Sequence, residues 1–185
     1  MAEVTVEPAE FRNVFFDAAE ISRIVGSLCD DIGLEAPVRL EVDESTPLGR
    51  VDLVSLDPVT VAVQSGALED KKHPRHLGER ETADNLGRTL VKVTDRLSPE
   101  FGDPPPVGEE IPLALYVAWD TYAMGRLARL GYYAQRQRRL YAFQLRHGFT
   151  DAATAAFDQL WAADSLTWAD IVALSDQARA GADAA

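Results

Sequence analysis

Residues 111–149 read IPLALYVAWDTYAMGRLARLGYYAQRQRRLYAFQLRHGF, and the rest of the chain is organised around this stretch. It contains a single acid, Asp120, and six arginines, in a protein of 185 residues whose formal net charge is -12. A basic island therefore lies between two acidic segments. The favoured interpretation is that its arginines pair with acids of the flanks and hold the fold together, because proteins place most of their charge on solvated or paired surface.

The pattern of this stretch is helical, because its apolar residues recur at steps of three and four and so share one helical face. One continuous helix over 111–147 would be about 55 Å long at about 1.5 Å per residue. A compact chain of this size has a radius of gyration of only about 16 Å. We therefore predict two helices, roughly 110–130 and 132–147, that break at Gly131, because glycine weakens a helix interior.

The other segments predict a mixture of helices and short strands. Residues 1–7 are expected to form an extended arm, and a helix is expected from Pro8 to the glycine cap at Gly33. Residues 38–42, 50–54 and 59–63 alternate between apolar and polar, as half-buried strands do, and their short connections favour an antiparallel meander. A further helix is expected over about 78–97, and two more follow the arginine-rich stretch. The predicted fold class is α+β, with a small antiparallel sheet of about three strands packed against five or six helices, in a single domain over residues 1–185 with an ordered core over about 8–178.

The order of helix, three strands and helix over residues 8–97 resembles that of minimal zincin metallopeptidases. In that family the helix after the sheet carries the motif H-E-x-x-H, whereas the corresponding helix here begins Glu79-Arg80-Glu81-Thr82-Ala83. The resemblance implies a zincin-like homologue that lacks the metal ligands and the chemistry. No functional residue is carried over from it.

Motifs of catalysis and cofactor binding are missing from the sequence. It has no phosphate-binding G-x-x-x-x-G-K-[ST] loop, no G-x-G-x-x-G after a strand and no G-x-S-x-G elbow. His73 and His76 lie in a polar segment, but Pro74 separates them and a zinc site needs three or four ligands. We expect a solvated loop there, no metal and no cofactor. Cys29 is the single cysteine, and its apolar helical context predicts a core residue rather than a nucleophile.

Composition restricts the compartment and the partners. The N-terminus shows neither the basic nor the apolar region of a secretory signal, and the longest apolar run, 112–119, is shorter than the ~20 residues of a membrane span. We expect a soluble cytoplasmic protein with no membrane association. The acidic balance argues against a nucleic-acid partner, which would require a basic surface.

The candidate site residues come from the arginine-rich stretch. Asp120 and Arg138 both fall on its apolar face, where a buried charge needs a partner. Asp120 either forms a structural ion pair, for example with Arg88 or Arg96, or lies in a pocket as an acid, a base or a ligand anchor. The candidate ligand-binding residues are Asp120, Arg126, Arg129, Arg136 and Arg138, and the sequence identifies no catalytic residue.

Two classes of function remain open alongside the zincin-like alternative. The leading hypothesis is a non-catalytic protein that binds a protein partner or a second copy, because Trp119, Tyr122, Tyr132 and Tyr133 beside arginines have the composition of interface centres. The same aromatics also fit a buried core, and this interpretation is favoured. The alternative is a small-anion-binding protein or an enzyme with an arginine-lined pocket. Between a non-catalytic protein and an enzyme, the enzyme is the less expected.

Overall fold

The structure is a computed structural model that describes residues 2–183, with side chains through residue 180. The described part of the chain is α+β, which confirms the predicted fold class. Its contacts divide it into two compact units, Met1–Leu97 and Ser98–Ala185, and each unit is described by itself. The single domain expected from the sequence stays a prediction.

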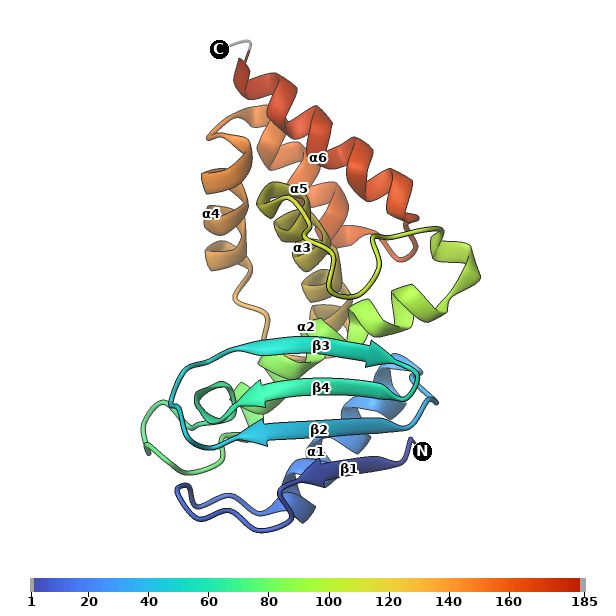
Figure 1. The fold of residues 1–185 in the computed structure, drawn as a ribbon. Helices are drawn as coiled ribbons and strands as arrows, with labels where there is room; N and C mark the ends of the chain where they lie inside the picture. Colours follow the sequence, from blue (N-terminus) through green and yellow to red (C-terminus); the bar gives the residue numbers. More distant parts are fainter. Residues whose placement is uncertain (1, 184–185) are drawn as a thin grey trace. The chain divides into compact units, whose positions relative to one another are not determined.

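The first unit contains a mixed sheet of four strands (Figure 1). The strands are β1 (Val4–Glu7), β2 (Val38–Asp43), β3 (Val51–Leu56) and β4 (Val59–Gln64), in the order β1-β2-β4-β3. β1 pairs with β2 and β2 with β4 in parallel, whereas only β3 and β4 are antiparallel. The expected antiparallel meander of three strands is therefore wrong, and the expected arm at 1–7 supplies the fourth strand. The connections explain the difference. A helix connects β1 to β2, so these two strands run parallel. Residues 44–50 connect β2 to β3 and leave a place between them, which β4 fills.

Two helices, α1 (Ala18–Ile32) and α2 (Glu79–Leu97), cover one face of this sheet (Figure 1). The helix expected from Pro8 begins only at Ala18, because the carboxylate of Asp17 accepts the backbone N–H of Ala19 at 2.8 Å and caps it. It ends as predicted at Gly33, whose φ of 71° is left-handed. Buried apolar side chains of both helices and of the sheet form the core of the unit, together with the short helix η1 (Ser65–Ala67): Ile21, Val25, Leu28, Leu40, Val61, Leu86 and Leu90.

The second unit is helical. It consists of the short helix η2 (Pro99–Phe101) and of α3 (Leu113–Arg129), α4 (Arg136–His147), α5 (Asp151–Ala162) and α6 (Trp168–Asp183). The predicted break of the arginine-rich stretch is confirmed, because Gly131 has a φ of 92° and the chain turns between Arg129 and Arg136. The core of this unit contains Trp119, Phe143, Phe157, Leu160 and Ile171, each at most 1% exposed.

Helices α3 and α5 approach each other closely at Gly125. A Cβ atom at this position would lie 2.2 Å from the carbonyl oxygen of Trp161. Only glycine permits this contact, since the neighbour is backbone and cannot rotate away. Across residues 2–183, no helix combines the length and the apolar character that crossing a membrane requires.

Candidate functional site

Asp120 lies in α3 and is 8% exposed. Its carboxylate oxygen Oδ2 is 3.6 Å from Nη1 of Arg139 in α4, so the acid has a cationic partner within its own unit. The pairing with Arg88 or Arg96 stays a prediction. A carboxylate held beside a guanidinium in this way favours the structural interpretation of Asp120, because a buried charge is tolerated only when it is paired.

Arg138 shares a face of α4 with Tyr141 and Leu145, as predicted, but all three side chains are exposed, so the expected burial of this charge is wrong. Arg139 lies on the inner side instead, with its side chain 21% exposed. The physical reason is the turn before α4, where Gly131 and Gln135 both take positive φ angles. This turn resets the helical register, so the stripe of α3 does not continue by simple counting into α4.

Arg129 and Arg136 bind α5 and the loop that follows it. The guanidinium of Arg129 donates to the carbonyl of Trp161 at 2.6 Å and to that of Ala163, and its Nε lies 3.2 Å from Asp164. These are favourable contacts, because the last carbonyls of a helix carry partial negative charge. Arg136 donates to Asp158 and lies over the ring of Phe157, with its Cζ atom 5.3 Å from the centroid.

Arg126, another of the residues predicted to bind an anion, lies over the ring of Tyr122. Its Cζ atom is 5.3 Å from the ring centroid. The structure therefore directs Arg129 and Arg136 to acids of the C-terminal flank, as the pairing interpretation predicted. It does not bring Arg138 together with them. The anion-binding role of the five residues stays a prediction.

The aromatic residues beside these arginines separate into two groups. Trp119 and Tyr122 are 1% and 3% exposed and belong to the core, where Trp119 stacks on Phe101 at 5.6 Å between centroids. Tyr132 is half-buried, whereas Tyr133 is 52% exposed. The favoured interpretation of these aromatics as core is thus confirmed for Trp119 and Tyr122.

An exposed apolar surface lies on α4 and on Phe149 just after it, and it was missed by the sequence reasoning. Tyr141, Leu145 and Phe149 are each more than half exposed, and the rings of Tyr141 and Phe149 are 5.8 Å apart. Arg138 and Arg146, both exposed, flank these side chains. The sequence contains no Asp or Glu from residue 121 to residue 150. These five residues form an apolar and cationic surface that we call the α4 face.

The inner side of α4 carries a buried histidine–serine pair. Nδ1 of His147 is 3.0 Å from the carbonyl oxygen of Phe143, and Nε2 is 2.9 Å from Oγ of Ser175 in α6. A carbonyl only accepts, so Nδ1 carries the proton and Nε2 accepts the hydroxyl of Ser175. His147 and Ser175 are 1% and 3% exposed, so a substrate has no access to the hydroxyl. The pair links α4 to α6.

We expect this pair to make the second unit less stable as the pH falls. Burial lowers the pKa of His147, and the positive charge of Arg179 lowers it further, while the hydrogen bond to Phe143 opposes the shift. Below the unfolded value of about 6.5, the unfolded chain binds a proton that the folded chain does not, so stability is lost as the pH falls through this window. Urea unfolding followed by tryptophan fluorescence should show this loss, and His147→Gln should make the profile flatter. An unchanged slope would contradict this role.

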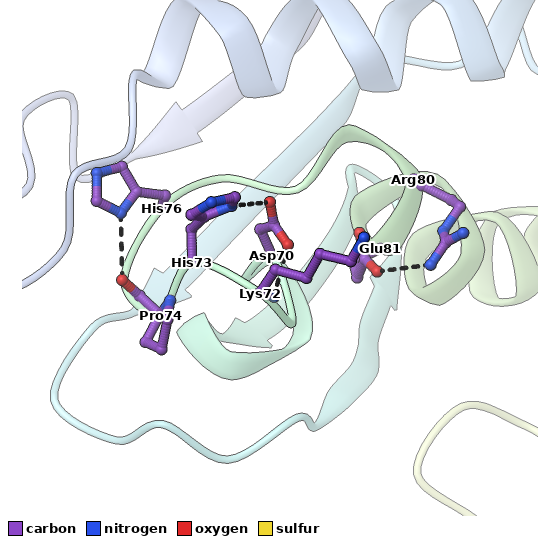
Figure 2. A network of polar contacts seen from close by, with 7 residues as sticks. All are labelled: Asp70, Lys72, His73, Pro74, His76, Arg80 and Glu81. Atoms are coloured by element: carbon purple, nitrogen blue, oxygen red, sulfur yellow. Dashed lines mark hydrogen bonds and ion pairs between the residues drawn. The ribbon is translucent and has the colours of Figure 1, made fainter.

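The solvated loop was predicted over residues 66–78 and is confirmed for residues 71–76, which are all exposed, whereas Ala67 and Leu68 are buried. Figure 2 shows its polar contacts, in which Nδ1 of His73 is 2.8 Å from Asp70 and Nδ1 of His76 is 3.2 Å from the carbonyl oxygen of Pro74. The hydrogen bond from His73 lowers the pKa of Asp70. Among the described residues, no three or more His, Cys, Asp or Glu side chains gather in a group that could hold a metal ion.

Comparison with known proteins gives no match to a family model, to a curated protein or to a solved structure.

Proposed function

We propose that the chain is a non-catalytic binding protein whose α4 face docks an acidic, apolar segment of a protein partner. The observation that carries this proposal is the exposure of Tyr141, Leu145 and Phe149 side by side on one surface. Adjacent exposed apolar side chains with a polar rim mark interaction surfaces. Tyrosine and arginine are also the residues that dominate binding energy in protein interfaces.

The charge of the α4 face supports an acidic partner. Arg138 and Arg146 lie beside the apolar side chains, and a carboxylate-bearing segment would complement them. A second copy fits less well, because α4 packed on α4 about a twofold axis would bring the arginines of one chain near those of the other. A cytoplasmic location is also part of this proposal.

The test uses a fluorescein-labelled amphipathic peptide built from glutamate and leucine, and a matched peptide built from lysine and leucine. Fluorescence anisotropy should show binding of the glutamate peptide, weakened by salt, and little binding of the lysine peptide. Tyr141→Ala with Leu145→Ala should weaken binding about tenfold or more.

The matched control is Leu48→Ala, which removes another exposed apolar side chain, 63% exposed, from the first unit. This variant should bind the glutamate peptide like the wild-type chain. Wild-type affinity in the α4 double variant, or equal affinity for both peptides, would rule out the α4 face as the docking surface.

A further inference from the structure

The strand β1 forms one edge of the first unit's sheet. It pairs with β2, and among the described residues no further strand lies on its other side. The N–H of Val38 donates to the carbonyl of Glu3 at 2.8 Å. The backbone groups of successive residues in a strand point alternately to one side and to the other. Because Glu3 faces β2, Thr5 and Glu7 also direct their N–H groups to β2, whereas Val4 and Val6 direct theirs outward.

An open hollow of about 510 Å³ lies between β1 and α1. The strand side contributes Ala2 and Val4, and the helix contributes four small residues and two charged ones: Ala19, Ser22, Gly26, Ser27, Arg23 and Asp30. The hydroxyl of Ser22 donates to the carbonyl of Val4 at 2.9 Å and fixes the helix beside the strand. A Cβ atom added at Gly26 would meet none of the described atoms within 4 Å, so the hollow reaches the helix backbone there.

The two edges of the sheet differ. At the β3 edge, the pairing with β4 shifts between Leu53 and Ser55, and such a bulge makes an edge a poor template for another strand. At the β1 edge, the register runs without a shift from Val4 to Glu7. A regular edge beside a helical wall is the arrangement in which several domains add an extended peptide to a sheet.

We infer that the β1 edge and the adjoining hollow bind an extended segment of a partner protein in which small apolar and basic side chains alternate. Successive side chains of an added strand point to opposite faces. One set would enter the hollow beside Val4, and the other set would lie on the face where Glu3 and Glu7 are exposed, Glu7 being paired with Arg39 of β2 at 2.7 Å. The first unit supplies further negative charge, since residues 1–97 carry 11 Lys and Arg against 19 Asp and Glu, a net charge of -8.

A second copy of the chain is a poor occupant of this edge. Antiparallel pairing of β1 with β1 about a twofold axis at Thr5, the register that pairs the strand over its full length, would bring Glu3 of one chain opposite Glu7 of the other, and like charges directly opposite destabilise a strand pair. Backbone pairing would supply affinity for the basic segment, and the hollow would select its side chains.

Two substitutions test the site without entering the core. Gly26→Leu places a larger side chain in the hollow, where a Cβ atom meets none of the described atoms within 4 Å. Val6→Pro removes an N–H that points outward and leaves the pairing of Thr5 and Glu7 with β2, as proline on an edge strand does. Circular dichroism melts verify that each variant is folded.

The probe is a fluorescein-labelled peptide of alternating lysine and valine, with a glutamate and valine peptide as the charge control. The wild-type chain should bind the lysine peptide, and each of the two variants should lower the affinity about tenfold or more. Tyr141→Ala with Leu145→Ala should leave this binding unchanged, which separates a failure here from a failure of the α4 face.

Three results would overturn the inference. The first is equal binding of the lysine and glutamate peptides, or no binding of either. The second is wild-type affinity in folded Gly26→Leu. The third is a dimer in light scattering that Val6→Pro dissociates, because the occupant of the edge would then be a second copy.

Discussion

Gly125→Ala is expected to lower the free energy of unfolding of the second unit by about 3 kcal/mol or more. The added Cβ would lie 2.2 Å from the carbonyl oxygen and 2.8 Å from the carbonyl carbon of Trp161, so α3 and α5 would have to separate. The gain in helix propensity, about 1 kcal/mol, is too small to offset this clash. All three tryptophans, Trp119, Trp161 and Trp168, belong to residues 98–185, so tryptophan fluorescence in urea reports the unfolding of this unit.

The control for this substitution is Gly26→Ala in α1. A Cβ there meets no described atom within 4 Å, so the same chemical change should raise the stability of the first unit by about 0.5–1 kcal/mol. Circular dichroism reports both units and tryptophan fluorescence only the second, so a change seen by circular dichroism alone belongs to the first unit, which lacks tryptophan. If both substitutions stabilise the chain, the close approach of α3 and α5 at Gly125 is refuted.

Phe157→Ala is expected to cost about 3–5 kcal/mol of the stability of the second unit. The side chain is fully buried in α5, and its ring centroid lies 5.8 Å from that of Phe143 and 5.5 Å from that of Trp161. Removing the ring leaves a cavity and also removes the surface on which Arg136 lies. Urea unfolding followed by tryptophan fluorescence measures the loss.

Phe149→Ala is the matched control, because it removes the same ring from a position that is 62% exposed. Its effect on stability should stay within about 0.5 kcal/mol. Comparable losses for the two phenylalanines would mean that the buried and the exposed side of the second unit have been assigned wrongly.

Local patterns predicted the elements of the fold better than their pairing. The glycine break at Gly131 and the glycine cap at Gly33 follow from backbone conformation, which is a property of single residues. The parallel pairing of β2 with β4 could not be predicted in this way, because the alternation of side chains within one strand does not identify the strand beside it. The helix was expected to begin at Pro8, but Asp17, nine residues later, is the residue that caps α1.

The candidate site was predictable only in part. Pairing of the arginines with the acidic C-terminal flank followed from charge, and Arg136 with Asp158 is an example. Which residues of α4 are buried and which are exposed could not be predicted from the sequence, because the helix has apolar side chains on both sides. Phe143 is buried and Leu145 is exposed, and periodicity alone cannot choose between the two stripes.

The hydrogen bond between His147 and Ser175 has a consequence for binding on the opposite side of α4. This bond holds α4 to α6, and the ion pair of Arg139 with Asp120 holds it to α3. Within α4, the ring of Phe143 stacks on that of His147 at 3.8 Å. Tyr141 and Leu145 therefore stand on a preorganised backbone. A partner that docks on them would find the surface already shaped, and little conformational entropy of the main chain would be lost in the complex.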